Sequence, residues 1–236
     1  MNEFDNMKMT LSFNELYSYI LRQLNFFFPD KHCIVDCELM KNALNTALQR
    51  TEECFKHILL KGYSENGNAL FNHLHSDQYS QFLYFYANTL WKMNADQIIC
   101  DKLLYLNRTL HSIFVSYKCN LPEHFVFGHP VGTVIGNAHY NDFLVIFQNV
   151  TINTAGDNSK QLPELGKGLF LGTGCKIIGN KPIGDRVSLG VNAFVNNIEI
   201  ASDSVVLNSN GNNIIRPRIK NKCFAQNYFD IEISQY

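Results

Sequence analysis

The sequence predicts an α+β fold in which an N-terminal α-helical domain is followed by a parallel β-helix. Apolar residues recur at helical spacing in the first half of the 236-residue chain, and aliphatic residues recur every six positions in the second half. The period changes near Asn120 and Pro122. We therefore expect a helical domain at residues 1–118, a β-helix at residues 119–209 and a C-terminal tail at residues 210–236.

Helical periodicity indicates roughly four to six helices in the first domain. The clearest segments run from Leu11 to about Phe28, from about Asp36 to Leu60, from Ser76 through Trp91, and from about Asp96 to Tyr117. Pro29 ends the first segment, because a proline inside a helix removes a hydrogen bond and clashes with the preceding turn. The hydroxyl of Ser76 suits this residue to be the N-cap of the third segment.

The second half carries a six-residue repeat with one interruption. The repeated positions are Val134, Tyr140, Ile146, Ile152, Leu165, Leu171, Ile177, Ile183, Leu189 and Val195. Neither a helix nor a strand has this period, whereas short flat strands joined by tight corners do. Glycine follows the aliphatic residue at positions 166, 172, 184 and 190, where its backbone freedom would suit a corner. A β-sandwich is the alternative, but its side chains alternate with period two.

The composition limits the classes of partner and compartment. A net charge of −1 gives no broad basic surface, so we expect no nucleic-acid partner. Residues 1–10 are polar and no apolar run is long enough to cross a bilayer, which indicates a cytoplasmic protein without a membrane span. The seven cysteines are scattered, and Cys33 with Cys37 has no second pair at zinc-finger spacing, so we expect reduced thiols and no metal site.

Four short motifs carry a resemblance to a known family. They are Asp77-Gln78-Tyr79-Ser80, His129 followed by Gly132 and Val134, Gln148-Asn149-Val150-Thr151-Ile152, and Gly172-Thr173-Gly174-Cys175-Lys176-Ile177. In this order and at these separations they resemble the serine acetyltransferases, which transfer an acetyl group from acetyl-CoA to the hydroxyl of serine. The resemblance covers the chain from about Asp77 onward. It implies a left-handed β-helix of hexapeptide repeats, acetyl-CoA as co-substrate, and a homotrimer or a dimer of trimers.

By this resemblance, His129 is the catalytic histidine. Transfer to a hydroxyl needs a general base, because an alkoxide-like oxygen forms as the thioester is attacked, and imidazole titrates near neutral pH. A structural histidine at a corner of the β-helix is the alternative. Glu123 is the nearest preceding acid that could orient the ring, and a backbone carbonyl is the other choice. The other seven histidines are each expected to be structural.

The positions that correspond to the family's acceptor site are His73, Asp77 and Gln161. His73 and Gln161 stand where the family has an aspartate and a basic residue, and Leu162 stands in place of its second histidine. Gly128 replaces the acidic residue that precedes the catalytic histidine. A small zwitterion needs countercharges that fix its orientation, and these contacts are missing together.

The expected activity is therefore acetyl transfer to another small-molecule acceptor, through a hydroxyl of a sugar or sugar nucleotide used in surface-polysaccharide synthesis. A serine O-acetyltransferase of cysteine biosynthesis, with a rebuilt acceptor pocket, is the alternative. A catalytically silent trimeric scaffold is a third possibility.

The resemblance places acetyl-CoA along the corners of the later coils. These corners are Thr173, Gly174, Ser188 and Gly190. Small side chains there would let a pantetheine arm lie close to the backbone, although small residues also suit any β-helix corner. Arg216 and Arg218 resemble the stretch that follows the family's last coil, and we expect them to contact the phosphates of CoA. A solvated tail is the alternative for this polar segment.

Overall fold

The computed structural model describes residues 7–153 and 162–236. The chain divides into two compact units, Met1–Lys56 with Leu60–Lys118 and His57–Leu59 with Cys119–Tyr236. These are called the helical unit and the coil unit below, and each is described by itself. Gln161, one of the expected acceptor positions, lies outside the described residues.

The described part of the helical unit contains four α-helices and a small sheet in the order β1-β3-β2. The elements are β1 (Met7–Met9), α1 (Phe13–Phe27), α2 (Glu38–Phe55), β2 (Ser64–Glu65), β3 (Asn68–Phe71), α3 (Ser76–Lys92), α4 (Gln97–His111) and β4 (Phe114–Val115). The four expected helices are confirmed, although α2 and α4 end earlier than the sequence predicts. None of these helices combines the length and the apolar character needed to cross a lipid bilayer.

Local sequence signals set the ends of α1 and α3. Ser12 and Glu15 form a capping box at the start of α1, and the helix ends at Phe27, two residues before Pro29. The N-cap of α3 is His75 and not the expected Ser76, because the His75 side chain accepts a hydrogen bond from the backbone N–H of Gln78 at 3.4 Å. An imidazole can thus replace the hydroxyl or carboxylate of the usual N-cap.

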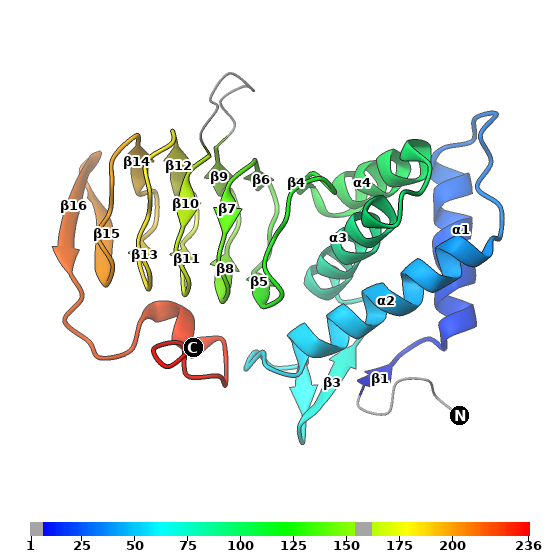
Figure 1. Ribbon diagram of the computed structural model, residues 1–236, viewed down its shortest axis with the longest axis horizontal. Helices are drawn as coiled ribbons and strands as arrows, with labels where there is room; N and C mark the ends of the chain where they lie inside the picture. The colour runs from blue at the N-terminus through cyan, green and yellow to red at the C-terminus, as the bar shows by residue number, and fades with distance from the viewer. Residues whose placement is uncertain (1–6, 154–161) are drawn as a thin grey trace. The chain divides into compact units, whose positions relative to one another are not determined.

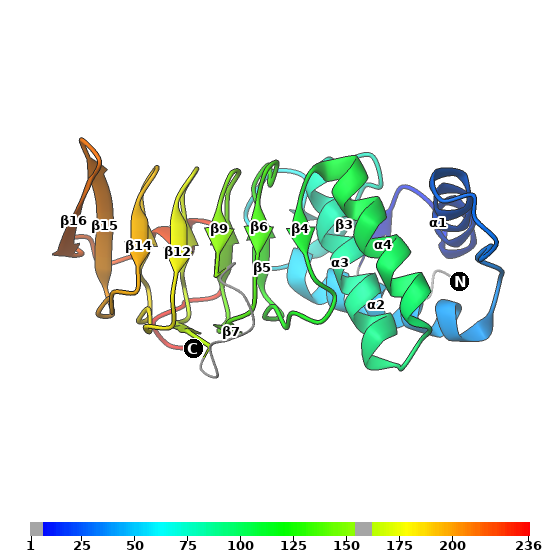
Figure 2. The same ribbon diagram turned by 90° about the horizontal axis from the view of Figure 1, so that it is seen from above.

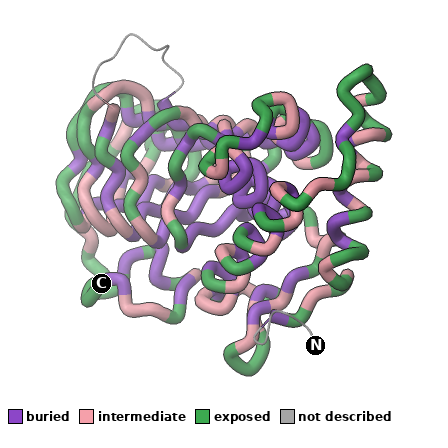
Figure 3. The backbone as a smooth tube through the Cα atoms, turned by 45° about the vertical axis from the view of Figure 1, so that its right-hand side comes forward, coloured by how far each residue is buried: buried purple, intermediate pink, exposed green. Residues whose placement is uncertain are grey.

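The core of the helical unit is built around α3. Every residue from Asp77 to Leu90 is buried, because α2 and α4 both pack against this helix. Polar side chains on α3 are satisfied internally: Asn88 donates to the carbonyl of Tyr117 at 2.8 Å, and Asn107 of α4 donates to the carbonyl of Ser80 at 2.9 Å. Figure 3 shows this buried stretch in purple among partly exposed helices.

The coil unit is a parallel β-helix in which the chain visits three sheets in turn. Its elements are β5 (Phe125–Phe127), β6 (Val134–Ile135), β7 (His139–Tyr140), β8 (Leu144–Ile146), β9 (Thr151–Ile152), β10 (Glu164–Leu165), β11 (Phe170–Leu171), β12 (Lys176–Ile178), β13 (Ser188–Leu189), β14 (Phe194–Asn196), β15 (Ser204–Ser209), β16 (Asn212–Pro217) and the 3-10 helix η1 (Phe224–Asn227).

Parallel pairing joins equivalent strands of successive coils (Figures 1 and 2). One ladder runs β5-β8-β11-β13-β15 and a second runs β6-β9-β12-β14. The third joins β7 to β10, and isolated bridges extend it from Leu165 to Ile183 and on to Ile200. These ladders confirm the predicted parallel architecture and exclude the β-sandwich, whose sheets are antiparallel.

The six-residue repeat supplies the inside of the coil. Its members from the second coil onward are each at most 2% exposed: Ile146, Ile152, Leu165, Leu171, Ile177, Ile183, Leu189 and Val195. The first repeat is offset, because Ile135 and not Val134 pairs with Ile152 and is fully buried. The predicted phase is therefore wrong by one residue at β6, where the spacing to Tyr140 is five residues instead of six.

Two corner glycines are required by close approach of the next coil and not by an unusual backbone conformation. Gly166 and Gly184 are absent from the residues with positive φ. A Cβ atom on Gly166 would lie 2.4 Å from the carbonyl carbon of Gly184, and one on Gly184 would lie 2.4 Å from the backbone nitrogen of Ser202. Backbone freedom is therefore the wrong explanation here, since the spacing of stacked parallel strands leaves no room for a side chain.

Residues 210–236 do not form the solvated tail considered above. β16 pairs with β15 in antiparallel register, and the segment that follows packs back on the coil. The ring of Phe224 lies 4.4 Å from that of Phe170, and the ring of Phe229 lies 5.3 Å from that of Phe143. Aromatic side chains of this segment cover apolar groups of the coil that would otherwise contact water, which explains why the segment is ordered.

Replacing Gly166 by alanine should lower the free energy of unfolding by about 3 kcal/mol, because the new Cβ would overlap the backbone of the next coil. Gly190→Ala is the matched control, since its Cβ would first meet the mobile end of Leu207 at 3.1 Å, and it should cost less than about 1 kcal/mol. Urea titration followed by circular dichroism measures both. Equal losses would show that close stacking at Gly166 does not limit stability.

Candidate functional site

His129 lies at an exposed corner directly after β5 and has an unusual backbone conformation. Its φ is +49°, in the left-handed region that costs a non-glycine residue about 1–2 kcal/mol. The ladder registers place it in the same coil position as Gln148, Thr173 and Val191, and none of these three has a positive φ. At the other three corners the next residue takes this conformation instead: Asn149 with φ +57°, Gly174 with +71° and Asn192 with +56°. A left-handed residue is therefore a regular feature of these corners, and the His129 corner differs in which residue adopts it.

A side chain on the residue before His129 would be crowded by an aromatic ring. A Cβ atom on Gly128 would lie 3.0 Å from the ring of Phe147, which belongs to the next coil. Phe147 is in turn fixed by ring contacts with Phe170 at 5.6 Å and with Tyr228 at 6.0 Å. An aromatic wall therefore occupies the space beside Gly128, where the resembled family has an acidic residue.

Three of the six expected cofactor positions line one cavity of about 240 Å³. These are Ser188, Arg216 and Arg218, and the cavity is further lined by Val205, Pro217, Ile219, Lys220, Lys222 and Phe224. Four cationic side chains thus surround a small space between the last coils and the returning segment. Such a cavity fits an anionic group, and above all a phosphate.

Two buried polar atoms at this cavity lack hydrogen-bond partners within the described residues. They are the hydroxyl Oγ of Ser188, a residue that is 6% exposed, and the Nε of Arg218. A buried donor without a partner costs about 1–3 kcal/mol, so native proteins leave such groups where a ligand or water satisfies them. Both atoms can hydrogen bond to oxygen atoms of a bound anion.

Asp203 fixes one wall of the cavity. Its carboxylate accepts hydrogen bonds from Arg186 Nε at 2.9 Å and Nη2 at 2.7 Å, and it also accepts one from Arg218 Nη2. The backbone N–H of Arg218 donates to the Asp203 carbonyl at 2.7 Å. The hydrogen bond from Arg186, followed by that from Arg218, holds the pKa of Asp203 at about 2.

The remaining cofactor positions lie on the coil but do not line this cavity. Thr173 is half-buried, and its carbonyl accepts from the backbone N–H of Asn192 at 2.9 Å. Gly174 has a φ of +71°, and a Cβ there would meet the side-chain oxygen of Asn192 at 2.2 Å. Gly190 donates its N–H to the carbonyl of Val206 at 2.8 Å. The positive φ and the close approach of Asn192 together explain the glycine at position 174.

Two acceptor positions expected from the sequence lie in the helical unit. His73 Nδ1 is 2.7 Å from the hydroxyl of Thr10, and its ring packs edge-on against Tyr19 at 5.2 Å. Asp77 is buried in the first turn of α3, with Ser76 Oγ 3.3 Å from its carboxylate. Both residues have local partners that account for their positions within this unit.

The sequence missed Phe147 and Asp203 as members of these sites. Phe147 follows a buried strand like any core aromatic, and nothing in its spacing shows that it fills the place beside Gly128. Asp203 is separated from Arg186 by 17 residues, which is one turn of the coil, so coil spacing applied to charged residues could have found this pair.

Comparisons with known proteins agree with the resemblance seen in the sequence. No protein-family model matches the chain. A serine acetyltransferase of Synechococcus elongatus is 31% identical over 125 residues, which cover 52% of this chain and 51% of that protein. The chain thus spans about half the length of this relative. This match confirms the similarity of the sequence to serine acetyltransferases.

Solved structures agree on the fold. A serine acetyltransferase of Neisseria gonorrhoeae matches with a TM-score of 0.66 at 15% identity, over 86% of this chain and 80% of that one. A serine acetyltransferase in complex with CoA matches with a TM-score of 0.54 at 17% identity, over 85% of this chain and 76% of that one. Helices followed by parallel sheets are therefore shared with these proteins.

The Asp203 carboxylate should stabilise the protein in a pH-dependent way. Its pKa lies below the ordinary value of 3.8, so its stabilising effect is present above about pH 4 and is lost as the pH falls toward 2. Because the side chain is 41% exposed, we expect Asp203→Asn to cost only about 1 kcal/mol at pH 7. Urea titrations at pH 7 and pH 2.5 measure this: the difference between wild type and variant should be clearly smaller at pH 2.5, and an undiminished difference there would contradict the prediction.

Proposed function

We propose that the protein is an acetyl-CoA-dependent O-acetyltransferase with His129 as its general base. The observation that carries this proposal is the cationic cavity at Ser188, Arg216 and Arg218, positions that the family resemblance assigns to acetyl-CoA. The two buried atoms at the cavity, Ser188 Oγ and Arg218 Nε, fit a ligand that supplies oxygen acceptors. The sequence relatives named serine acetyltransferases support the same activity.

In this proposal His129 moves one proton. It accepts the proton of the acceptor hydroxyl while that oxygen attacks the acetyl carbonyl carbon, and it returns the proton to the CoA sulfur when the carbon–sulfur bond breaks. The products are an acetyl ester and free CoA thiol. The exposed position of His129 at a corner of the coil suits this role, because a general base must be reachable by the acceptor hydroxyl.

Serine is the acceptor that the comparisons favour, since the relatives are named serine acetyltransferases. Serine O-acetylation is the alternative to the transfer to a sugar or sugar nucleotide that the sequence predicts. The comparisons favour that alternative. One observation keeps a sugar as the second candidate: Gly128 offers no carboxylate to an ammonium group, and the ring of Phe147 lies beside it, 3.0 Å from where a Cβ atom would be. A flat aromatic face suits the C–H face of a sugar ring.

The proposed enzyme is a homotrimer or a dimer of trimers with a left-handed coil, as the family resemblance implies. Exposed apolar side chains on the coil support an association between copies: Val191 is 61% exposed, Phe194 47% and Ile198 46%. In a closed ring of identical subunits, each copy would bury the same residues against its neighbours.

An acceptor panel tests the proposed activity. We expect purified protein to release CoA thiol from acetyl-CoA in the presence of L-serine, at least 10 times faster than with homoserine, hexoses or nucleotide sugars. Thiol release is followed with a chromogenic disulfide. Faster release of CoA thiol with a sugar than with serine would make the sugar the acceptor. No release with any acceptor would contradict the proposed acetyltransferase activity.

His129→Ala should reduce acetyl transfer by about 10²–10⁴-fold and leave the affinity for acetyl-CoA nearly unchanged, because only proton transfer is removed. The loss should appear in kcat. His139→Ala is the control, since this histidine also lies on the coil and its side chain is 59% exposed. A His129→Ala variant with near wild-type turnover would show that another group acts as the base.

A further inference from the structure

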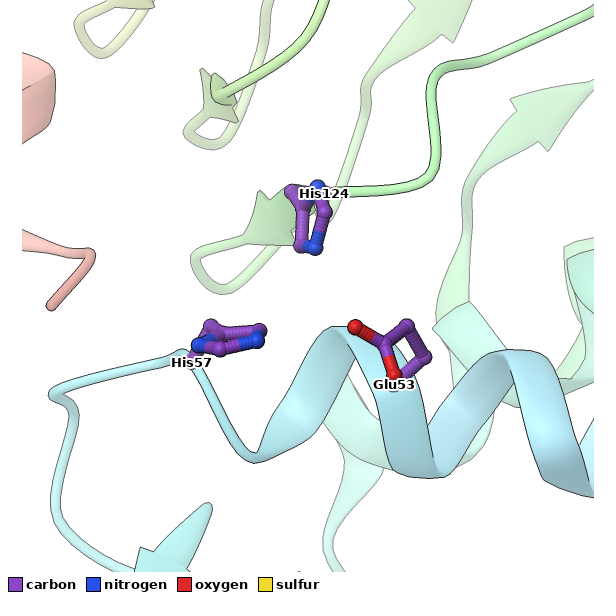
Figure 4. A group of neighbouring side chains, drawn as sticks. All are labelled: Glu53, His57 and His124. Atoms are coloured by element: carbon purple, nitrogen blue, oxygen red, sulfur yellow. The ribbon is translucent and has the colours of Figure 1, made fainter. Parts of the chain in front are cut away.

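Two histidines far apart in the sequence come together in the coil unit, away from the residues used above. His57 follows α2 in the chain, and His124 directly precedes β5. Their ring centroids are 5.4 Å apart with an angle of 68° between the ring planes. The nitrogen atoms that each could offer to a metal lie within 4.8 Å of one another. Figure 4 shows both rings, together with Glu53, which precedes His57 by about one helical turn in the chain.

In each ring the Nδ1 atom lies beside a carboxylate, which orients the ring. His57 Nδ1 lies 2.8 Å from Asp230 Oδ1, and His124 Nδ1 lies 2.8 Å from Asp142 Oδ2. A carboxylate accepts, so each neutral ring carries its proton on Nδ1 and its lone pair on Nε2. Metal-binding histidines in proteins are oriented in this way, with the second ring nitrogen donating to a carboxylate.

The surrounding chain holds His124 in place. Its ring stacks on Phe143 at 5.3 Å with an interplanar angle of 14°, and its backbone N–H donates to the other oxygen of Asp142 at 2.8 Å. The His124 side chain is 8% exposed. Binding of a ligand therefore costs this ring little side-chain entropy.

His57 is held by the returning C-terminal segment. Its carbonyl accepts from the backbone N–H of Asp230 at 3.1 Å, and the neighbouring Ile58 forms an antiparallel bridge with Phe229. Asp230 thus fixes both the backbone and the ring of His57. The segments that present the two imidazoles pack together, because Phe143, which stacks on His124, also contacts Phe229 beside Asp230.

We propose that His57 and His124 bind one divalent transition-metal ion of the Zn²⁺, Ni²⁺ or Cu²⁺ class through their Nε2 atoms. Imidazole nitrogen selects these ions over Mg²⁺ and Ca²⁺, which prefer oxygen. Zn–N bonds of about 2.0–2.1 Å in tetrahedral geometry require the two nitrogens to be roughly 3.4 Å apart, a distance within the 4.8 Å limit found here. The ion would fasten the segment after α2 to the start of the coil.

The test is a titration of full-length protein, without a polyhistidine tag, with ZnCl₂ in a calorimeter. We expect one ion per chain, affinity at least 10-fold weaker in His57→Ala, and affinity about 10–100-fold weaker in Asp230→Asn, because that carboxylate orients the ring. Asp230 is 50% exposed, so its replacement should leave the fold intact. His139→Ala should bind as the wild type does.

A second readout is the visible absorption of Co²⁺, which should appear with the wild type and be lost with His57→Ala. Equal Zn²⁺ affinity of wild type and His57→Ala would overturn the proposal, and so would binding that His139→Ala removes. The two rings would then have a structural role only, each held by the carboxylate beside it. Neither readout uses acetyl transfer, so the result is independent of the proposed enzymatic function.

Discussion

Close stacking of successive coils is the constraint on which the coil unit depends. Backbone hydrogen bonds such as Gly172 N–H to Leu189 O at 2.9 Å and Gly190 N–H to Val206 O at 2.8 Å hold equivalent strands at ladder spacing. This spacing excludes any side chain at Gly166 and Gly184, where the next coil lies against the corner. The interior is filled by the repeated aliphatic residue of each strand together with other buried residues, such as Leu169, Cys175 and Val187.

The same stacking builds the candidate cofactor cavity. Ser188 and Val205 pair across adjacent strands of one ladder and so line the cavity together. The rest of the lining comes from the end of β16 and the residues that follow it, and Asp203 holds this segment through its hydrogen bonds with Arg218. A carboxylate that is held by two arginines neutralises part of their charge, and the cationic character of the cavity then rests chiefly on Arg216, Lys220 and Lys222.

The spacing of apolar residues along the chain predicted the helices and the six-residue repeat, because both are set by local periodicity. Helical spacing and the residues at helix ends gave four correct helices, and the six-residue phase gave the interior of the coil from Ile146 onward. The prediction was wrong by one residue at Ile135, since a periodic pattern cannot locate the single shorter repeat at its start. His75 replaced Ser76 as N-cap because local propensity does not anticipate a capping imidazole.

Contacts between segments that are distant in the chain could not be predicted from the sequence. The order of the C-terminal segment depends on Phe224 and Phe229 finding ring partners on the coil, and a polar composition hides them. The aromatic ring beside Gly128 and the pairing of His57 with His124 likewise join residues whose separations, 19 and 67 positions, carry no local signal. The cofactor cavity was predicted in part, because the family resemblance named three of its residues.

The most direct test of the cavity as the CoA site is calorimetric titration of CoA into the wild type, Arg216→Gln and Lys181→Gln. Both variants remove one exposed positive charge, but only Arg216 lines the cavity. Loss of a charge-assisted hydrogen bond should weaken binding by about 10-fold or more in Arg216→Gln and leave Lys181→Gln close to wild type. Equal CoA affinity in all three proteins, or no CoA binding by the wild type, would contradict the site.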